Sequence, residues 1–578
     1  MIKKYSISLV AASVIASASL SVHANEGYDV VDLGTLPDAV SSNPQRMNED
    51  GLAVVQNSNL WNQNIRFDLL DPELFHFIDP ENPTDSDYRI VRSYLNNYNG
   101  SGASPALQKL GTVVSHVYDT DYRELTGFDQ IDPETGEYTD SVNVRALDIN
   151  IHGSIVGQAT KPYERRMTTD REGEQVEYFI RDSFPQGFIK INEEITYLQS
   201  DADVFNGGVS SATSVNYNPE LELTQVVGYA SVAHSSGLEN RITTCTTLPD
   251  DYEEGDAHAS KEELTVCVWR SWLQREVATT LAGSNRQPIF IEQAYIWEFD
   301  NSGAMVNART LGSLEEVEDG DSHELRSSAL DINDAGIAVG RSGFNYEAPN
   351  GATVAINTAV VFRDDQIIDI LKVADNPDDL SVYGTGSNAA TAISNSNMVV
   401  GYSNRRIGFS TRERLFFYDL NDPQAEAVFP LGFYANSSWR PRAINNHNMV
   451  VGRTDTTAQS SGLRPTVGFL YDINTDEITD LNTLLPCGSE YRIVDALDIN
   501  DDGEILAMGT TVTEIDIDGE AVEQNALRAL RLQPSSAEPC GVDERVERQG
   551  AALHPLLAGV MALIAVLLIT RRRLLRRK

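Results

Sequence analysis

The stretch ALDINDAGIAVGRS, residues 329–342, is the unit around which this chain is organised. Ile332 ends a short apolar run, polar residues follow, and Gly336 supplies the positive φ that a tight turn requires. Residues 337–339 then form a second apolar run, which ends at Gly340. This pattern predicts a β-hairpin whose strands are buried on at least one side.

Degenerate copies of this hairpin recur along most of the chain, and we count seven of them. The third copy, residues 212–228, has an enlarged turn. Two copies have asparagine in place of the turn glycine, and asparagine is the other residue that best tolerates the left-handed region. The predicted turn positions are Gly51, Gly153, Gly336, Asn397, Asn448 and Gly503.

Between the hairpins lies a looser pattern of a strand, a polar turn and a second strand that ends near a leucine, as in residues 467–481. Each complete unit therefore holds about four strands in roughly 40 to 60 residues, which is the size of a propeller blade. We predict an all-β fold, a β-propeller of about seven four-stranded blades. A linear solenoid is the alternative, but neither end of the repeat array shows a capping repeat.

The two ends of the repeat array complement each other. The last unit has no fourth strand after Leu530, whereas YDVVDLGTL, residues 28–36, resembles a fourth strand with no other three before it. We therefore predict that the N-terminal strand completes the final blade. Such a closure removes the open edges of a linear array.

Three long polar insertions interrupt the early blades, and we expect them to be loops on one face of the propeller. They cover about residues 68–138, 161–184 and 239–286.

All four cysteines lie in the part of the chain that we expect to be exported, where disulfides form. Proximity in the sequence favours Cys245 with Cys267 and Cys487 with Cys540, although four cysteines permit three pairings. Metal binding is the weaker alternative, since none of the cysteines lies in a C-x-x-C motif.

Both ends of the chain resemble targeting segments. Residues 1–24 combine two lysines, an apolar run and a small-residue cleavage site, as in a signal peptide. The propeller is expected over residues 25–540 and a charged linker over 541–550. Residues 551–570 are apolar and long enough for a transmembrane helix, and the basic tail 571–578 should stay in the cytoplasm. We therefore expect an inner-membrane anchor with the propeller in the periplasm.

The formal net charge of the chain is −41, and because the two basic ends contribute +8, the part between them carries −49. Such a field repels nucleic acid and anionic lipid, so we exclude both as partners of the folded part. A solvated acidic surface is the simplest interpretation. The partners that remain are the membrane, through the C-terminal helix, and an envelope protein or polysaccharide.

The sequence contains no catalytic or cofactor signature such as G-x-S-x-G, H-E-x-x-H, a Walker loop or G-x-G-x-x-G. We therefore predict no catalytic and no cofactor-binding residues. Residues 498–504 resemble the start of a calcium loop, but position 12 is Gly509 instead of the closing carboxylate. Two acidic clusters keep calcium as a candidate ligand. They are Asp250, Asp251, Glu253, Glu254 and Asp256 in one loop, and Glu315, Glu316, Glu318, Asp319 and Asp321 in another.

The pattern in residues 329–340 and 146–157, together with the Asp-Leu-Gly-Thr-Leu opening at residues 32–36, resembles the HAF-type extracellular repeat. The order of signal, repeats and anchor is similar to an envelope family of Gram-negative bacteria catalogued as domain of unknown function 3466. Some members of that family end in glycines, an apolar helix and a basic cluster, which a rhomboid-type protease could cut. Here only Gly550 precedes the helix, so we expect stable anchoring, with release to the cell surface as the alternative. The resemblance implies no reaction.

The sequence favours a binding or scaffolding module of the cell envelope over an enzyme. A propeller-based hydrolase or lyase is the alternative. Histidine, aspartate and glutamate side chains that converge at one mouth of the central channel would support that alternative.

Overall fold

The computed structural model describes residues 27–96, 104–253, 255–278, 289–316, 326–347, 351, 353–373, 388–408, 410–457, 464–517, 520–536 and 539. The predicted signal peptide, linker, transmembrane segment and basic tail lie outside these residues. Within the described part, no helix is long and apolar enough to cross a membrane.

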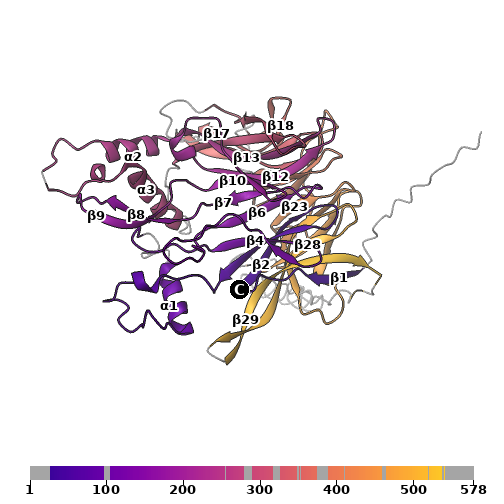
Figure 1. Ribbon diagram of the computed structural model, residues 1–578. Helices are drawn as coiled ribbons and strands as arrows, with labels where there is room; N and C mark the ends of the chain where they lie inside the picture. The colour runs from indigo at the N-terminus through magenta and orange to yellow at the C-terminus, as the bar shows by residue number, and fades with distance from the viewer. Residues whose placement is uncertain are drawn as a thin grey trace, which may run out of the picture.

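Seven antiparallel sheets form the blades, which confirms the predicted seven-bladed propeller (Figure 1). The first blade consists of β2 (Ala39–Met47), β3 (Ala53–Leu60), β4 (Val113–Tyr118) and β5 (Tyr122–Glu124). The second consists of β6 (Val144–Ile149), β7 (Ile155–Ala159), β10 (Gln186–Ile191) and β11 (Glu194–Leu198). The third consists of β12 (Ser210–Asn218), β13 (Leu223–His234), β14 (Phe290–Phe299) and β15 (Met305–Gly312).

The fourth blade consists of β16 (Ser327–Ile332), β17 (Ala338–Glu347), β18 (Thr353–Arg363) and β19 (Gln366–Asp369). The fifth has three strands, β20 (Ala389–Ile393), β21 (Met398–Ile407) and β22 (Ser410–Asp419), and an isolated bridge from Phe417 to Val428 beside them. The sixth consists of β23 (Trp439–Ile444), β24 (Met449–Asp455), β25 (Thr466–Asp472) and β26 (Glu477–Asp480). The seventh contains β27 (Arg492–Ile499), β28 (Ile505–Ile517) and β29 (Glu520–Ser535).

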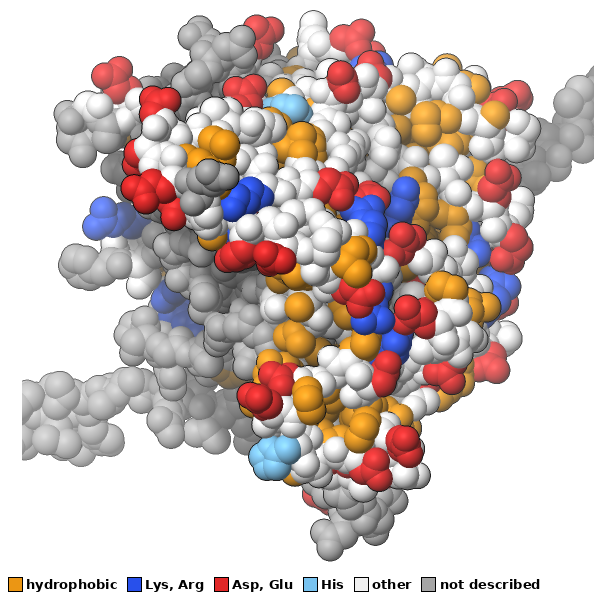
Figure 2. All heavy atoms as spheres, turned by 60° about the vertical axis from the view of Figure 1, so that its left-hand side comes forward, with side chains coloured by type: hydrophobic (Ala, Val, Ile, Leu, Met, Phe, Trp, Pro, Cys, Tyr) orange, Lys and Arg blue, Asp and Glu red, His pale blue; other side chains and the backbone are white. Residues whose placement is uncertain are grey.

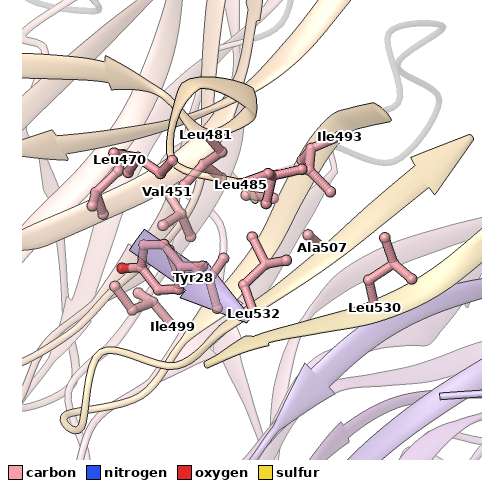
Figure 3. Packing of buried hydrophobic residues seen from close by; sticks show 14 residues of the cluster. Tyr28, Val451, Leu470, Leu481, Leu485, Ile493, Ile499, Ala507, Leu530 and Leu532 are labelled. Atoms are coloured by element: carbon pink, nitrogen blue, oxygen red, sulfur yellow. The ribbon is translucent and has the colours of Figure 1, made fainter. Parts of the chain in front are cut away.

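The N-terminal strand closes the ring, as predicted. β1 (Gly27–Asp32) pairs antiparallel with β29 along its whole length, and Figure 1 shows indigo β1 beside the yellow strands of the seventh blade. The Tyr28 ring lies among Val451, Ile499 and Leu532 (Figure 3). The seventh blade therefore contains strands from both ends of the repeat array, and the linear solenoid is wrong.

The core is a ring of apolar clusters, and in the described part each pair of neighbouring blades shares one. Successive residues of a strand point to opposite faces of its sheet. Accordingly, Val339 packs toward the fifth blade and the preceding Ala338 toward the third. At the junction of the seventh and first blades, the fully buried Leu33 from the segment after β1 packs in the cluster that these two blades share. The apolar pairs of the repeat thus form the contacts between blades.

A β-bulge interrupts the innermost strand of every blade at the same repeat position. In β16 the register shifts between Ala329 and Asp331, so that Leu330 is the extra residue. The next strand approaches closely there, and a Cβ on Gly340 would lie 2.0 Å from the carbonyl oxygen of Ser328. At Gly340 the close packing of the strands therefore leaves no room for a side chain, whereas the first and seventh blades have Val55 and Ala507 at this position. The bulge redirects the residue that follows it.

The insertions are folded, whereas the sequence predicted only loops. The first contains α1 (Asp85–Leu95), which begins with a capping box between Thr84 and Asp87. The second contains the hairpin of β8 (Glu164–Thr169) and β9 (Gln175–Ile180), and the third contains α2 (Ser236–Thr246) and α3 (Leu264–Ala278). Short 3-10 turns occur at Phe67–Leu69, Phe205–Gly207, Ala259–Lys261 and Leu481–Thr483.

The second and third insertions form one lobe beside the blades (Figure 1). Trp269 of α3 packs in one cluster with Phe179 and Ile180 of β9. The predicted disulfide between Cys245 and Cys267 is present and joins α2 to α3. The lobe has apolar contacts and a crosslink of its own, and it also packs on the third blade through Phe290 of β14.

The expected first insertion, residues 68–138, contains β4 and β5, so its predicted boundary is wrong. The sequence did not indicate β5, because its three exposed residues show no apolar alternation.

Cys487 is also disulfide-bonded, but Cys540 lies outside the described residues. The pairing of these two cysteines therefore stays a prediction.

Candidate functional site

The order of strands gives the propeller two different faces. In an antiparallel blade, the connection between the first and second strands lies at the opposite end from the connection between the second and third. The repeat turns, such as residues 333–336, therefore lie together on one face, which we call the turn face. All three insertions connect second to third strands, so they lie on the other face, which we call the insertion face (Figure 1).

The residues that follow the seven bulges occupy equivalent places around the central channel, and we call them the ring positions. An apolar residue directly follows each ring position, and in most blades the residue after that is an asparagine. The ring positions are Arg46, Asp148, Ser214, Asp331, Ala392, Ala443 and Asp498. Three aspartates and one arginine thus meet where the bulges direct them.

Each ring aspartate holds the next blade by accepting a hydrogen bond from a backbone N–H. The donor and acceptor pairs, at 2.8 to 2.9 Å, are Val215 to Asp148, Ile393 to Asp331 and Met47 to Asp498. Within the ring, Arg46 Nη1 donates to Asp498 and Ser214 Oγ donates to Asp331, each at 3.0 Å. The carboxylates are therefore fixed in position by the closure of the propeller.

Burial raises the pKa of all three ring carboxyl groups, and the pKa of Asp148 reaches about 7. Burial alone would lower the pKa of Arg46, but the carboxylates of Asp498, Asp331 and Asp148 raise it. The arginine therefore stays charged and partly neutralises the ring. Three acids with one base leave an excess of negative charge at the ring.

The asparagine of the repeat has a structural role that explains the motif. Asn333 Oδ1 accepts hydrogen bonds from the N–H groups of Ala335 at 3.1 Å and Ile337 at 3.0 Å, which closes the turn. Its Nδ2 donates to the carbonyl oxygen of Ser394 in the next blade at 3.3 Å. The same bond to the next blade runs from Asn48 to Asn150 and from Asn445 to Asn500.

Polar side chains one residue further along the repeat form a hydrogen-bonded rim around the channel mouth. Asn395 Nδ2 donates to Asp334 at 2.8 Å, and Asn446 Oδ1 accepts from the N–H of Asn395 at 2.8 Å. Asp501 accepts from Asn446 Nδ2 at 2.8 Å, and its own N–H donates to Glu49 at 2.9 Å. The rim therefore runs from the fourth blade to the first. The second and third blades have Ile151 and Tyr217 at this position.

Ring and rim enclose a cavity of about 480 Å³ at the mouth of the channel on the turn face. Its described lining holds one cation, Arg46, and no histidine, lysine or cysteine. The six lining carboxylates are Glu49, Asp148, Asp331, Asp334, Asp498 and Asp501. Such a cavity attracts a positively charged ligand and offers it charge-assisted hydrogen bonds.

The calcium candidates do not form a site in the described residues, where no three His, Cys, Asp or Glu side chains could hold a metal ion together. Asp498 bonds to Arg46, and Asp501 bonds to Asn446, so residues 498–504 do not converge. Glu315 accepts from the N–H of Asn345 at 2.6 Å. Four members of the two acidic clusters lie outside the described residues: Glu254, Glu318, Asp319 and Asp321.

The six predicted turn residues all have a left-handed backbone, with φ between 65° and 78°. They shape the turns but do not line the cavity. The sequence interpretation missed the ring and the rim, although an alignment of the seven copies would have shown aspartate three times at the ring position. Only the bulge shows that this position faces the channel.

A family model described as "Protein of unknown function (DUF3466)" matches residues 4–573, which confirms the family resemblance. The HAF-type repeat stays a prediction. No curated protein matches the chain.

Among solved structures, the chain is similar to an acylaminoacyl peptidase from Pyrococcus horikoshii, with 9% identity and a TM-score of 0.33 over 84% of this chain and 52% of that one. It is also similar to prolyl oligopeptidase B from Galerina marginata, with 9% identity and a TM-score of 0.28 over 61% of this chain and 41% of that one. A puromycin-hydrolyzing peptidase from Mycobacterium tuberculosis has 10% identity and a TM-score of 0.24 over 84% of this chain and 61% of that one. The chain thus spans about half the length of these proteins, and likenesses this low say nothing about activity.

Proposed function

Because the chain belongs to the DUF3466 family, whose description assigns no activity, we propose a function from the site itself: the protein is a binding module whose turn-face cavity takes an organic cation. We also propose that it is exported and anchored at the inner membrane, or displayed on the cell surface if the C-terminal segment is cleaved. The end segments of the sequence support this location. An envelope protein or polysaccharide that carries amino groups would meet the cavity there.

The charge imbalance of the cavity carries the proposal. Six carboxylates face a single arginine, and burial raises the pKa of the ring members although the charge of Arg46 opposes this rise. An ammonium or guanidinium group would supply that charge and donate hydrogen bonds to the same oxygens. The fixed positions of the carboxylates mean that little ordering is needed on binding.

The raised pKa of Asp148 is the one observation that favours the hydrolase or lyase alternative, because a pKa of about 7 suits a general base near neutral pH. However, its Oδ2 accepts the Val215 N–H, and the described lining contains no histidine or cysteine that could act with it. The cavity therefore supports binding better than catalysis.

Titration of the purified protein with putrescine, a flexible diamine, tests the proposal against 1,4-butanediol, its uncharged analogue. We expect saturable binding of the diamine only, weakened by added salt and weakened about tenfold by Asp331→Asn. The asparagine keeps an oxygen for the Ile393 N–H, so the ring geometry persists. Glu194→Gln, at an exposed position on β11, is the matched control and should bind as the parent does. Equal binding of diamine and diol, or no loss in Asp331→Asn, would overturn the proposal.

A further inference from the structure

A second cavity, of about 500 Å³, lies on the insertion face, between the first two blades rather than at the channel. The two ends of the first insertion, residues 64–66 and 108–109, form one wall. The passage from the first to the second blade, residues 130–141, and the start of the second insertion, residues 163–165, form the others. We call this cavity the insertion cleft.

Hydrogen bonds between these segments fix the walls of the insertion cleft. The Arg66 N–H donates to Gln108 Oε1 at 2.8 Å, and the Asn64 N–H donates to an Asp140 carboxylate oxygen at 2.7 Å. The cleft is therefore a preformed cavity, as ligand sites in proteins usually are.

Lys109 is buried in the wall of the insertion cleft, where the residue is only 7% exposed. Its ammonium group has three N–H donors, and its hydrogen-bond acceptor in the described part is the carbonyl oxygen of Ser104. No carboxylate of the described residues lies within ion-pair distance of Lys109. Burial accordingly lowers the pKa of Lys109 to about 7. A buried ammonium without an anion is costly, so its place in a cavity marks a candidate site.

The carboxylates of the insertion cleft do not compensate Lys109, because arginines engage two of them. Glu134 lies 2.9 Å from Arg66 and 3.3 Å from Arg165, and Asp132 lies 3.3 Å from Arg66. The other two lining carboxylates, Glu137 and Glu164, are exposed. Figure 2 shows basic and acidic side chains close together over part of the visible face. Among the described residues, Lys109 is thus the one basic side chain of the cleft lining that has no ion-pair partner.

Two aromatic side chains line the same cavity. Tyr163 and Phe179 both line the insertion cleft and are 8% and 9% exposed, so they offer an apolar wall to a flat ligand. A ligand that carries an anionic group beside an apolar ring would pair with the buried ammonium and pack against the aromatic side chains.

We propose that the insertion cleft is a second ligand site, which binds a small organic carboxylate through the Lys109 ammonium and packs the ring of that ligand against Tyr163 and Phe179. This site has the opposite charge preference to the turn-face cavity and does not depend on it.

Calorimetric titration of the full chain at a pH below 7 tests this site with two pairs of probes, benzoate against benzamide and glucuronate against glucose. Glucuronate and glucose show whether the site accepts a sugar acid, such as those in acidic polysaccharides, or only other small acids. We expect one or both carboxylates to bind about tenfold more tightly than their neutral partners, and Lys109→Met to remove that preference. Lys161→Met, an exposed lysine outside the cleft, is the matched control and should keep it.

A second measurement does not depend on a variant. In the parent protein, a bound carboxylate should move the NMR resonance of the Lys109 ε-methylene and raise the pKa of this group, whereas the neutral probes should not. Carboxylates that bind no better than their neutral partners, or an unmoved Lys109 resonance at saturation, would overturn the proposal.

Discussion

The two faces of the propeller are built in different ways. On the turn face every blade contributes the same repeat positions, and the bonds from blade to blade run through Asn333, Asp331 and their equivalents. On the insertion face three unlike segments form additional apolar clusters, one of which includes Phe290 of the third blade, and a disulfide ties one segment together. The ring must close, so the repeat positions are constrained, whereas the insertions can vary without opening the ring. The two cavities also carry unpaired charge of opposite sign.

Removal of residues 27–36 should have the largest effect, because it leaves β29 with an unpaired edge and removes the buried Tyr28 and Leu33. Several kcal/mol of apolar burial are lost, comparable with the whole stability of a domain. We expect aggregation or degradation, measured as the yield of soluble protein.

Removal of the hairpin 164–180 on the insertion face is the contrasting deletion. It uncovers Trp269 and should loosen the lobe, but the ring stays closed, so the blades should still melt cooperatively. If the protein without residues 27–36 were as soluble and heat-stable as the parent, the closure would not matter as we describe.

Gly340→Ala should be next in size, since its Cβ would lie 2.0 Å from a backbone carbonyl oxygen that cannot move freely. We expect a loss of roughly 3 kcal/mol or more in the free energy of unfolding. Gly343→Ala on the same strand is the control, because its nearest neighbour is at 3.3 Å, and it should cost about 1 kcal/mol or less. Equal denaturation midpoints for the two variants would mean that the bulge is not tightly packed.

Replacement of both Cys245 and Cys267 by alanine should affect the insertion face alone. Loss of a crosslink over a sequence separation of 22 residues costs about 3 kcal/mol in the loop-entropy picture. Hydrogen exchange should speed up in α2 and α3, while the strands of the ring keep their protection. Faster exchange throughout the blades would show that the two faces are not independent.

Asp148→Asn should change the pH dependence of stability. Burial raises the pKa of Asp148 from its ordinary value to about 7 in the folded protein, so between about 4 and 7 the folded chain binds a proton that the unfolded chain has lost. Stability from this group is therefore full at the acidic end and falls as pH rises to about 7. The variant avoids this loss, on the order of 4 kcal/mol, because asparagine cannot ionise. Thermal unfolding should show the variant to be more stable than the parent above pH 7 and equal to it near pH 4. A constant difference across this range would contradict the assignment.

The sequence predicted the parts of the fold that repeat. Seven hairpins, the left-handed turn residues and the closing strand could all be found because apolar pairs and glycines recur in register. α1 and α3 could not, because each insertion occurs once and offers no second copy for comparison. The strand β5 was hidden in an expected insertion because its three residues are all exposed.

The candidate site was harder to predict than the fold. Asp331 was visible in the repeat, but its direction depends on the bulge at Leu330, which no local pattern signals. Lys109 and Phe179 meet in the insertion cleft only because three connections from different blades pack together. Long-range packing of this kind is not written in the sequence pattern of any one segment.

We propose that the two faces bind ligands of opposite charge. Calorimetric titration of the parent, Asp331→Asn and Lys109→Met with putrescine and with benzoate tests it most directly. We predict that Asp331→Asn weakens putrescine about tenfold and leaves benzoate unchanged, and that Lys109→Met does the reverse. Variants that weaken both ligands together, or neither, would contradict this account.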